Sequence, residues 1–282
     1  MTVRAGGETK ARIVAIEDGV ARERTDHLAS EEPMEIRISW RGQVRTIAVT
    51  MRTPGHDFEL ACGFLASEGV IRGRDDLMKI AYCVDPEVDA TQRFNIVTVE
   101  LRDDALPDLR GLERHFFTNS SCGVCGKESL DQLELRGYAT TTSGPRVTAD
   151  VLQALPDRLR EAQDVFESTG GLHAAGLFAS SGETVAVRED VGRHNAVDKL
   201  AGWALLERAD LSERILLVSG RTSYEIMQKA LAAGIPIVCA VSAPSSLAVD
   251  VAQRFGMTLV GFLRGDRFNI YAGPDRITPR SF

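Results

Sequence analysis

The sequence has no apolar run long enough to span a lipid bilayer. Its longest apolar stretches, such as Ile235 to Val241, fall far short of the roughly 20 residues that a transmembrane helix needs. The N-terminus is polar, with Thr2, Arg4 and Glu8, and it lacks the apolar core of a signal peptide. We therefore expect a cytoplasmic protein that does not associate with membranes.

A disulfide framework is also missing. The chain has five cysteines, an odd number with uneven spacing, and a reducing compartment keeps such residues as thiols. Cys62, Cys83 and Cys239 lie in apolar segments and are predicted to be small buried hydrophobic residues. Cys122 and Cys125 differ, because they form a Cys-x-x-Cys pair in a polar, glycine-containing stretch.

The charge balance and two missing motifs exclude further classes. A net charge of −7 argues against a nucleic-acid partner, although local arginines could hold a small phosphorylated ligand. Neither G-x-G-x-x-G nor G-x-x-x-x-G-K-[ST] is present. The sequence therefore argues against an enzyme that transfers hydride from a dinucleotide or a phosphoryl group from a P-loop nucleotide.

The chain divides by pattern into three parts. Residues 1–30 are charged and without sustained periodicity, which predicts a flexible arm. Residues 31–145 form a β-rich subdomain that includes the cysteine loop at 118–128. Its predicted elements are a hairpin (Met34–Trp40 and Val44–Val49 around Arg41-Gly42-Gln43), a helix from Phe58 that ends at Gly69, and strands Met78–Val84 and Phe94–Leu101.

Residues 146–282 alternate strands with helices and predict an α/β domain. A hairpin (Ala174–Ala179, Thr184–Arg188) comes first, and a helix through Ala196 and Leu206 follows Gly192. The next elements are strand Arg214–Val218, helix Tyr224–Ala233, strand Ile235–Val241, helix Leu247–Phe255 and strand Thr258–Leu263. We predict βαβαβ crossovers on a mainly parallel sheet. Thr222 and Glu225 have the spacing of a capping box, and Pro244-Ser245-Ser246 announces the helix that follows.

Polar loops follow the three predicted parallel strands. Their serines, glycines and arginines suit an anionic ligand at the carboxyl edge of the sheet. The candidates are Ser219, Gly220, Arg221, Ser242, Ser245, Arg264, Gly265, Asp266 and Arg267. Alternatively, the serines are ordinary N-caps and the arginines are solvated.

Two histidines beside glycines, His173 and His194, could line the same cleft, or each could be structural. Asp190 and Asp198 fit an N-cap and a solvated helix charge.

The cysteine pair allows three interpretations. Lys127, with Arg114 and His115, could lower the pKa of a thiol, so that Cys122 accepts sulfur as a thiolate. Thioredoxin-type redox exchange would place the motif earlier, in a βαβ unit. A zinc site would need ligands beyond His115, and we predict no bound metal.

Several long segments resemble the FdhD family of formate dehydrogenase accessory sulfurtransferases. They are T-G-G-L-H-A-A from Thr169, E-D-V-G-R-H-N-A-V-D-K from Glu189, S-G-R-T-S-Y-E-I-M-Q-K-A from Ser219, A-V-S-A-P-S-S-L-A-V from Ala240, G-F-L-R-G-D-R-F-N-I-Y from Gly261 and the S-C-G-V-C-G-K loop. The resemblance implies a homodimer that takes sulfur from a cysteine desulfurase as a persulfide. It also implies transfer of that sulfur to the molybdenum cofactor, bis(molybdopterin guanine dinucleotide), before insertion into formate dehydrogenase.

By the same resemblance, Cys122 carries the persulfide, Cys125 assists, and Phe262, Leu263, Arg264, Gly265, Asp266 and Arg267 bind the cofactor. The implied fold is cytidine deaminase-like. Deamination itself is not expected, because the zinc motifs H-x-E and P-C-x-x-C are missing and Ser121 stands where proline would. The alternative function is a cofactor chaperone without catalysis, with a structural or zinc-bound cysteine pair.

Overall fold

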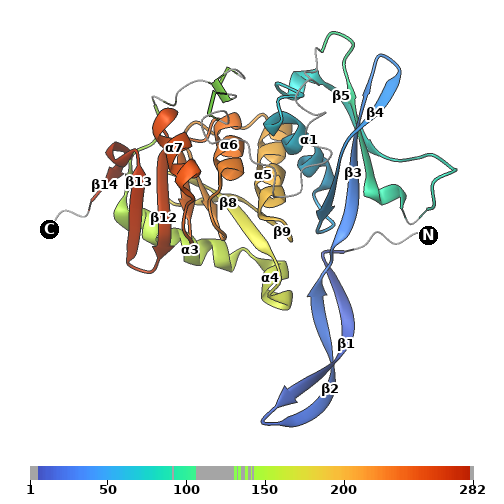
Figure 1. Cartoon of the computed structure of the whole chain (residues 1–282), viewed down its shortest axis with the longest axis horizontal. Coiled ribbons are helices and arrows are strands. Elements are labelled where there is room, and N and C mark those ends of the chain that lie inside the picture. The colour runs from blue at the N-terminus through green and yellow to red at the C-terminus, as the bar shows by residue number, and fades with distance from the viewer. Residues whose placement is uncertain are drawn as a thin grey trace.

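The computed structural model describes residues 6–90, 92–105, 130–131, 133–134, 137–138, 141 and 143–279. It is a mixed α/β protein with a four-stranded and a six-stranded sheet joined through a helix pair, and with a two-stranded arm (Figure 1). No helix within these residues is long and apolar enough to cross a membrane.

Most of the described N-terminal residues form a hairpin, which was not predicted from the sequence. β1 (Glu8–Glu17) pairs with β2 (Val20–Ala29) in an antiparallel ladder. Asp18 and Gly19 join the strands with φ of 52° and 77°, the left-handed pair that a tight hairpin turn requires. The hairpin projects from the body (Figure 1), which explains why its strands carry no clear apolar pattern.

The smaller sheet confirms the predicted hairpin, helix and two strands. It contains β3 (Glu32–Trp40), β4 (Gln43–Arg52), β5 (Leu77–Tyr82) and β6 (Ile96–Leu101) in the order β4-β3-β6-β5. α1 (Asp57–Ser67) packs Leu60, Ala61 and Leu65 against this sheet. Gly69 follows the helix with φ of 74°, a conformation that glycine adopts easily.

The larger sheet is mixed, which corrects the prediction of a mainly parallel sheet. Its order is β13-β12-β11-β10-β8-β9, and only the pairs β10–β11 and β11–β12 are parallel. Short turns join β8 to β9 and β12 to β13, and strands joined by a tight turn must run antiparallel. The strands are β8 (His173–Ala179), β9 (Thr184–Asp190), β10 (Arg214–Val218), β11 (Ile237–Ala240), β12 (Thr258–Arg264) and β13 (Arg267–Ala272).

Helices cover both faces of this sheet (Figure 1). One face packs against α5 (Arg193–Glu207), α6 (Tyr224–Ala232) and α7 (Ser246–Arg254), and the other against α3 (Ala149–Glu161). Successive residues of a strand point to opposite faces of the sheet, so Leu216 packs in the core beneath the three helices and Leu217 in the core beneath α3. The short elements α4 (Asp164–Thr169), β7 (Val147–Thr148) and β14 (Ile277–Thr278) complete the domain.

Some residues before the predicted boundary at 145 belong to the larger core. Leu130, Leu133 and Tyr138 pack with the cluster beneath α5, α6 and α7. Cys239 and Cys62 are fully buried, as predicted, and burial raises the pKa of the Cys62 thiol to about 12. Cys83 is only half-buried, because it lies just beyond the end of β5.

The two sheets are joined where α1 crosses α5 at two glycines. A Cβ on Gly63 would lie 1.8 Å from the Asp198 carbonyl oxygen, and one on Gly202 would lie 1.8 Å from that of Glu59. The helix backbones therefore touch, and any side chain at either position would collide with main-chain atoms.

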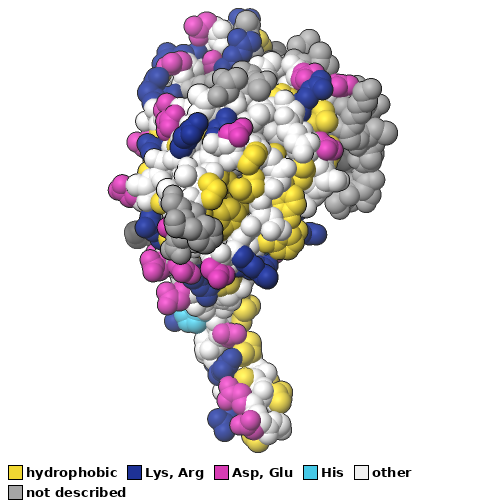
Figure 2. Space-filling view, turned by 90° about the vertical axis from the view of Figure 1, so that its left-hand side faces the viewer, with side chains coloured by type: hydrophobic (Ala, Val, Ile, Leu, Met, Phe, Trp, Pro, Cys, Tyr) yellow, Lys and Arg dark blue, Asp and Glu magenta, His cyan; other side chains and the backbone are white. Residues whose placement is uncertain are grey.

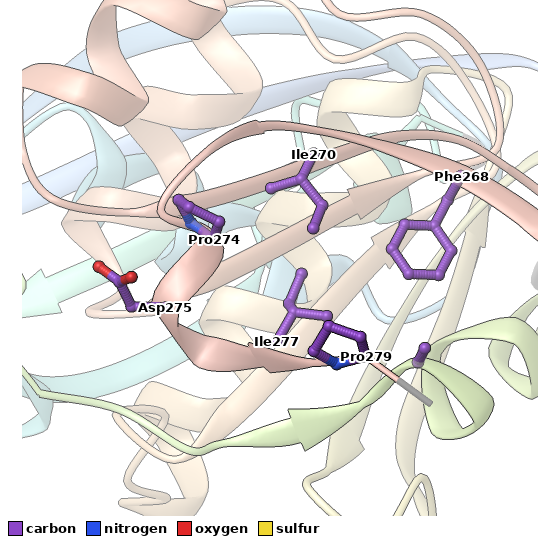
Figure 3. Close-up of a pocket in the computed structure, with 7 residues that line it drawn as sticks. Phe268, Ile270, Pro274, Asp275, Ile277 and Pro279 are labelled. Atoms are coloured by element: carbon purple, nitrogen blue, oxygen red, sulfur yellow. The ribbon is translucent and has the colours of Figure 1, made fainter. Parts of the chain in front are cut away.

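An apolar groove of about 510 Å³ lies beside the edge strand β13. Figure 2 shows apolar side chains gathered on this face, and Figure 3 shows Phe268, Ile270, Ile277 and Pro279 around the groove. None of the predicted site residues that the structure describes lines this groove.

Candidate functional site

One edge of the larger sheet collects most of the predicted site residues. The parallel strands β10, β11 and β12 end there, and α6 and α7 begin just beyond two of them. Because β8 and β10 are antiparallel, His173 at the start of β8 lies at this edge. Asp190 at the end of β9 pairs with His173, so α5 also begins here. Three helix N-termini therefore meet at one edge.

The loop after β10 is tied to the start of β8. The Ala174 N–H donates to Ser219 Oγ at 2.9 Å, and the Ser219 N–H donates back to the Ala174 carbonyl at the same distance. Gly220 lies beneath His173, whose Nδ1 would be 3.5 Å from a Cβ at that position. The structure thus brings Ser219, Gly220 and His173 together.

The loops after β10, β11 and β12 also bond to one another. The Thr222 N–H donates to the Ala243 carbonyl at 3.3 Å, and the Ser245 N–H donates to the Thr222 carbonyl at 2.9 Å. The Phe262 N–H donates to the Ser242 carbonyl at 3.1 Å. Ser242 and Ser245 therefore lie next to the Ser219–Thr222 loop, as predicted from the parallel strand order.

Two predicted helix starts have different outcomes. The start of α7 lies within the predicted Pro244-Ser245-Ser246 segment, and Ser245 is its N-cap, which accepts a hydrogen bond from the Ala248 N–H at 3.2 Å. The capping box at Thr222 is wrong, because Ser223 is the N-cap of α6 and the Thr222 hydroxyl has no partner among the described residues. The loop hydrogen bonds of the Thr222 backbone shift the helix start by one residue.

The segment Phe262–Arg267 comprises the end of β12, a two-residue turn and the first residue of β13. Leu263 is fully buried in the core facing α3, and its contact with a cofactor stays a prediction. A bulge at Phe262, where φ is 53°, turns Leu263 inward and leaves Phe262 40% exposed. Such a strained backbone at a large side chain is typical of functional sites.

The remaining residues of this turn are exposed. Arg264 Nε donates to the Val241 carbonyl at 2.9 Å, which holds the turn against the loop after β11. Gln153 of α3 donates to the Asp266 carbonyl at 2.6 Å. Gly265 has φ of 54°, and Arg267 opens β13. The turn therefore borders the site from the side of α3.

Burial and a neighbouring cation keep both histidines neutral. Burial first, and then the charge of Arg193, lower the pKa of His173, and the same two causes lower the pKa of His194 to about 4. His194 Nε2 lies 3.3 Å from Ser223 Oγ. A neutral imidazole can either donate a hydrogen bond to the Ser223 hydroxyl or accept one from it, depending on the tautomer.

The pKa of His194 predicts an acid-side loss of stability. Its value in the folded chain, about 4, lies below the ordinary 6.5, so the unfolded chain binds the proton more readily. The stabilising contribution is complete above about pH 6.5 and is lost as the pH falls toward about 4. We expect the His194 ring protons to titrate near pH 4 by NMR. We also expect His194→Gln to show a smaller loss of unfolding free energy on acidification; an equal loss would contradict the assignment.

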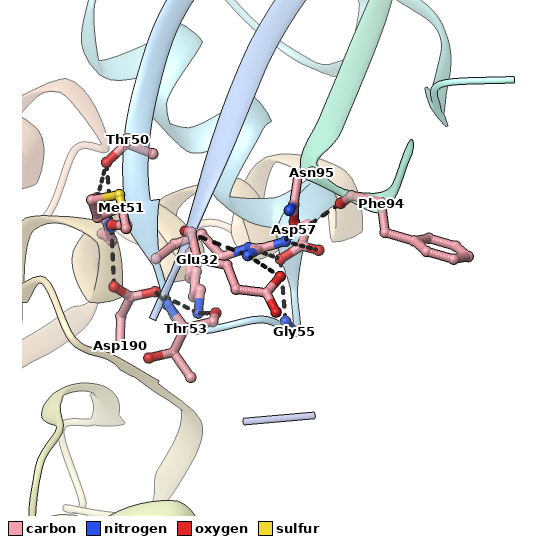
Figure 4. A network of polar contacts seen from close by, with 12 residues as sticks. Glu32, Thr50, Met51, Thr53, Gly55, Asp57, Phe94, Asn95 and Asp190 are labelled. Carbon is pink, nitrogen blue, oxygen red and sulfur yellow. Dashed lines mark hydrogen bonds and ion pairs between the residues drawn. The ribbon is translucent and has the colours of Figure 1, made fainter. Parts of the chain in front are cut away.

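A buried polar network fixes the start of α5 against the smaller sheet (Figure 4). Asp190 is fully buried and pairs with Lys199 at 2.7 Å. Its carboxylate also accepts from the N–H groups of Thr53 at 3.1 Å and Gly192 at 2.8 Å. Asp190 thus orients the site edge instead of acting as a plain N-cap.

Three further site residues could not be singled out from the sequence. Arg193, Lys199 and Thr53 lie at or beneath this edge, yet arginine and lysine in a helix are usually solvated. The sequence feature that could have pointed to Arg193 and Lys199 is their place in the long segment from Glu189 that resembles the FdhD family.

Cys122 and Cys125 lie outside the described residues, as do Lys127, Arg114 and His115. Across the parts of the chain that the structure describes, no group of three or more His, Cys, Asp or Glu side chains is placed to hold a metal ion.

Comparisons with known proteins agree with one another. The model of the FdhD/NarQ family matches residues 29–278. The sulfur carrier protein FdhD of Streptomyces coelicolor is 53% identical over 277 residues, which cover 96% of each chain. That of Mycobacterium tuberculosis is 51% identical over 260 residues, which cover 90% of this chain and 93% of the relative.

A solved structure is also similar along almost the whole chain. It is described as a formate dehydrogenase accessory protein from Desulfotalea psychrophila, with a TM-score of 0.73 and 27% identity over 96% of this chain and 99% of that one. Because the family model matches most of the chain and the relatives are about 50% identical over nearly its whole length, this chain belongs to the FdhD/NarQ family.

Proposed function

We propose that this protein is a sulfur carrier that serves formate dehydrogenase. The observation that carries the proposal is the roughly 50% identity, over nearly the whole chain, to proteins named sulfur carrier protein FdhD. The similar solved structure is described as a formate dehydrogenase accessory protein, which fits the same role. The Cys122-x-x-Cys125 pair supplies the thiol chemistry that sulfur carriage needs.

The proposed loading step is thiol exchange with a persulfide on a cysteine desulfurase. The Cys122 thiolate attacks the outer sulfur of the donor persulfide, the donor S–S bond breaks, and the donor leaves as a thiolate. Cys122 then carries the outer sulfur as a persulfide. The sequence supports this role through Lys127, which favours a thiolate in its neighbourhood.

The proposed unloading step uses the second thiol. The Cys125 thiolate attacks the inner sulfur of the Cys122 persulfide, forming a disulfide between the two residues and releasing the outer sulfur as hydrosulfide. The two thiols are oxidised and the transferred sulfur is reduced, so the electrons balance. A cellular dithiol would then restore the pair.

The proposed receiving substrate is the molybdenum bis(molybdopterin guanine dinucleotide). The three helix N-termini and the exposed Arg221, Arg264 and Arg267 at the site edge favour its phosphate groups. Holding the substrate there would bring its metal within reach of a persulfide and reduce the entropic cost of transfer. Cytoplasmic localisation, a homodimer and a cytidine deaminase-like fold stay predictions of the family resemblance.

The test of sulfur carriage is a loading experiment. We expect incubation with a cysteine desulfurase and L-cysteine to add sulfur to the wild type, seen as a gain in intact mass that a reductant reverses. The adduct should map to the Cys122 peptide and be lost in Cys122→Ala. Cys83→Ala, which removes a half-buried cysteine outside the motif, serves as the matched control and should load normally. An adduct that persists in Cys122→Ala contradicts the mechanism, and no adduct on any form, with zinc bound instead, favours the cofactor chaperone.

A further inference from the structure

A second groove, of about 390 Å³, lies between the C-terminal ends of α1, α5 and α6. The site edge lies at the opposite ends of α5 and α6, which begin at Arg193 and Tyr224. Small side chains form much of the groove's lining and leave a hollow between the helix ends. They are Ala66, Ala201, Ala204, Ala209, Ala232 and Ala233. The groove is therefore a separate feature from the candidate site.

The charge around this groove is positive. Among the described residues, its charged lining consists of Arg72, Arg74 and Arg208 with Asp75. Asp75 is already paired, because two nitrogens of Arg208 donate to its two carboxylate oxygens. Arg72 is exposed, and its guanidinium forms no hydrogen bond or ion pair with another described residue. Arg74 donates to the Leu77 carbonyl at 3.4 Å and forms no ion pair within the described ranges. Two arginines at the rim therefore lack a carboxylate partner in this part of the structure.

The lining defines the chemistry of a ligand that would fit. Alanine methyl groups favour short apolar side chains, whose burial removes apolar surface from water. Uncommitted guanidinium groups bind carboxylates, often through two parallel hydrogen bonds. The rim keeps a net positive charge even with the neighbouring Asp76, whose carboxylate accepts from the Arg72 N–H at 2.6 Å. The complementary ligand is a polypeptide segment that carries Asp or Glu beside small apolar residues.

The groove also lies beside both ends of the segment 106–129, which contains the cysteine pair. Near the start of this segment, the Arg102 N–H donates to the Asp76 carbonyl at 2.9 Å, next to the groove lining. Beyond its end, the Tyr138 hydroxyl donates to the carbonyl of Ser67, which lines the groove, at 3.3 Å. A protein bound in the groove would therefore be held close to the points where the chain enters and leaves this segment. Such tethering raises the effective concentration of one reactant near the other.

We infer that this groove is the docking site for the protein that donates sulfur to the cysteine pair. Arg72 and Arg74 bind carboxylates of an acidic segment of the donor, and short apolar side chains of that segment pack on the alanines. The inference rests on the proposed function for the identity of the donor, a cysteine desulfurase. Docking makes and breaks no covalent bond, so the groove sets the affinity for the donor and the rate of loading at low donor concentration.

The experiment measures desulfurase binding by calorimetry and sulfur loading by intact mass, for the full chain in four forms. Arg72→Glu reverses a charge at the rim, and Ala232→Leu fills the groove without changing charge. Arg146→Glu is the control, because Arg146 is exposed and does not line the groove. We expect Arg72→Glu and Ala232→Leu to bind the desulfurase about tenfold more weakly than the wild type and the control. Loading by a limiting amount of desulfurase should slow by a similar factor.

Inorganic polysulfide serves as a second sulfur donor that needs no docking, and it should load all four forms equally. Wild-type affinity of both groove variants for the desulfurase would overturn the inference and leave sulfur carriage untouched. A loss in Arg72→Glu alone would show attraction between charges without a segment seated in the groove, and would also overturn it. Slower loading of the groove variants by polysulfide would mean that the substitutions disturb the thiols instead of docking, which contradicts the inference. Failure of both donors to load the wild type would contradict the proposed function itself.

Discussion

Gly202→Ala is expected to destabilise the fold by at least about 3 kcal/mol, the upper end of the usual cost of overpacking a core. The new methyl group would lie 1.8 Å from the carbonyl oxygen of Glu59 and 2.6 Å from its carbonyl carbon. Both atoms are helix backbone, which cannot rotate away as a side chain could. The two helices would have to separate, which disturbs the contact that joins the two sheets. Urea denaturation measures the change in the free energy of unfolding.

The sign of this effect makes the test decisive. Alanine is favoured over glycine inside an isolated helix by about 1 kcal/mol, so without the contact the substitution would stabilise α5. Gly73→Ala is the matched control, because a Cβ there meets nothing within 4 Å and the backbone is extended. It should change stability by no more than about 0.5 kcal/mol. A stabilised Gly202→Ala protein would mean that α1 and α5 do not touch at this point.

The elements predicted well from the sequence are those with signals in their own residues. α7 begins at a serine cap, and β10 and β11 are short apolar runs with one helix between them. β1 and β2 were missed because they pack against little and so show no apolar alternation. The Asp18-Gly19 turn was the available signal, since this dipeptide favours the left-handed pair of a tight hairpin.

The candidate site was predicted in its loops but not in its supporting side chains. The parallel order of β10, β11 and β12 brings Ser219, Ser242 and Ser245 together, as the general rule for such sheets predicts. The burial of Leu263 could not be predicted, because a single bulge reverses which residues face inward. Asp198 was interpreted as a solvated helix charge, yet it is 1% exposed, because its partner Lys229 lies on a different helix.

Lys229→Met is expected to lower the free energy of unfolding by about 3–5 kcal/mol at neutral pH, as is typical when one partner of a buried ion pair is removed. Lys229 Nζ lies 2.8 Å from both carboxylate oxygens of Asp198. Ser67 Oγ donates to the same carboxylate at 2.9 Å and would be its remaining side-chain partner among the described residues. The variant would therefore hold a buried negative charge with one hydrogen bond. Urea denaturation of the variant and the wild type measures the difference.

The same loss should become smaller in acid. Burial raises the pKa of Asp198, and removal of the Lys229 charge raises it further, so the folded variant takes up a proton more readily than the unfolded chain. Stability is then regained as the pH falls through this raised pKa toward the ordinary value near 4. Lys229→Met/Asp198→Leu replaces both charges with apolar groups and should recover most of the loss at neutral pH. If the double variant stays as unstable as the single one, lost packing of the lysine stem rather than an unpaired charge is the cause, and the loss should then be the same at every pH.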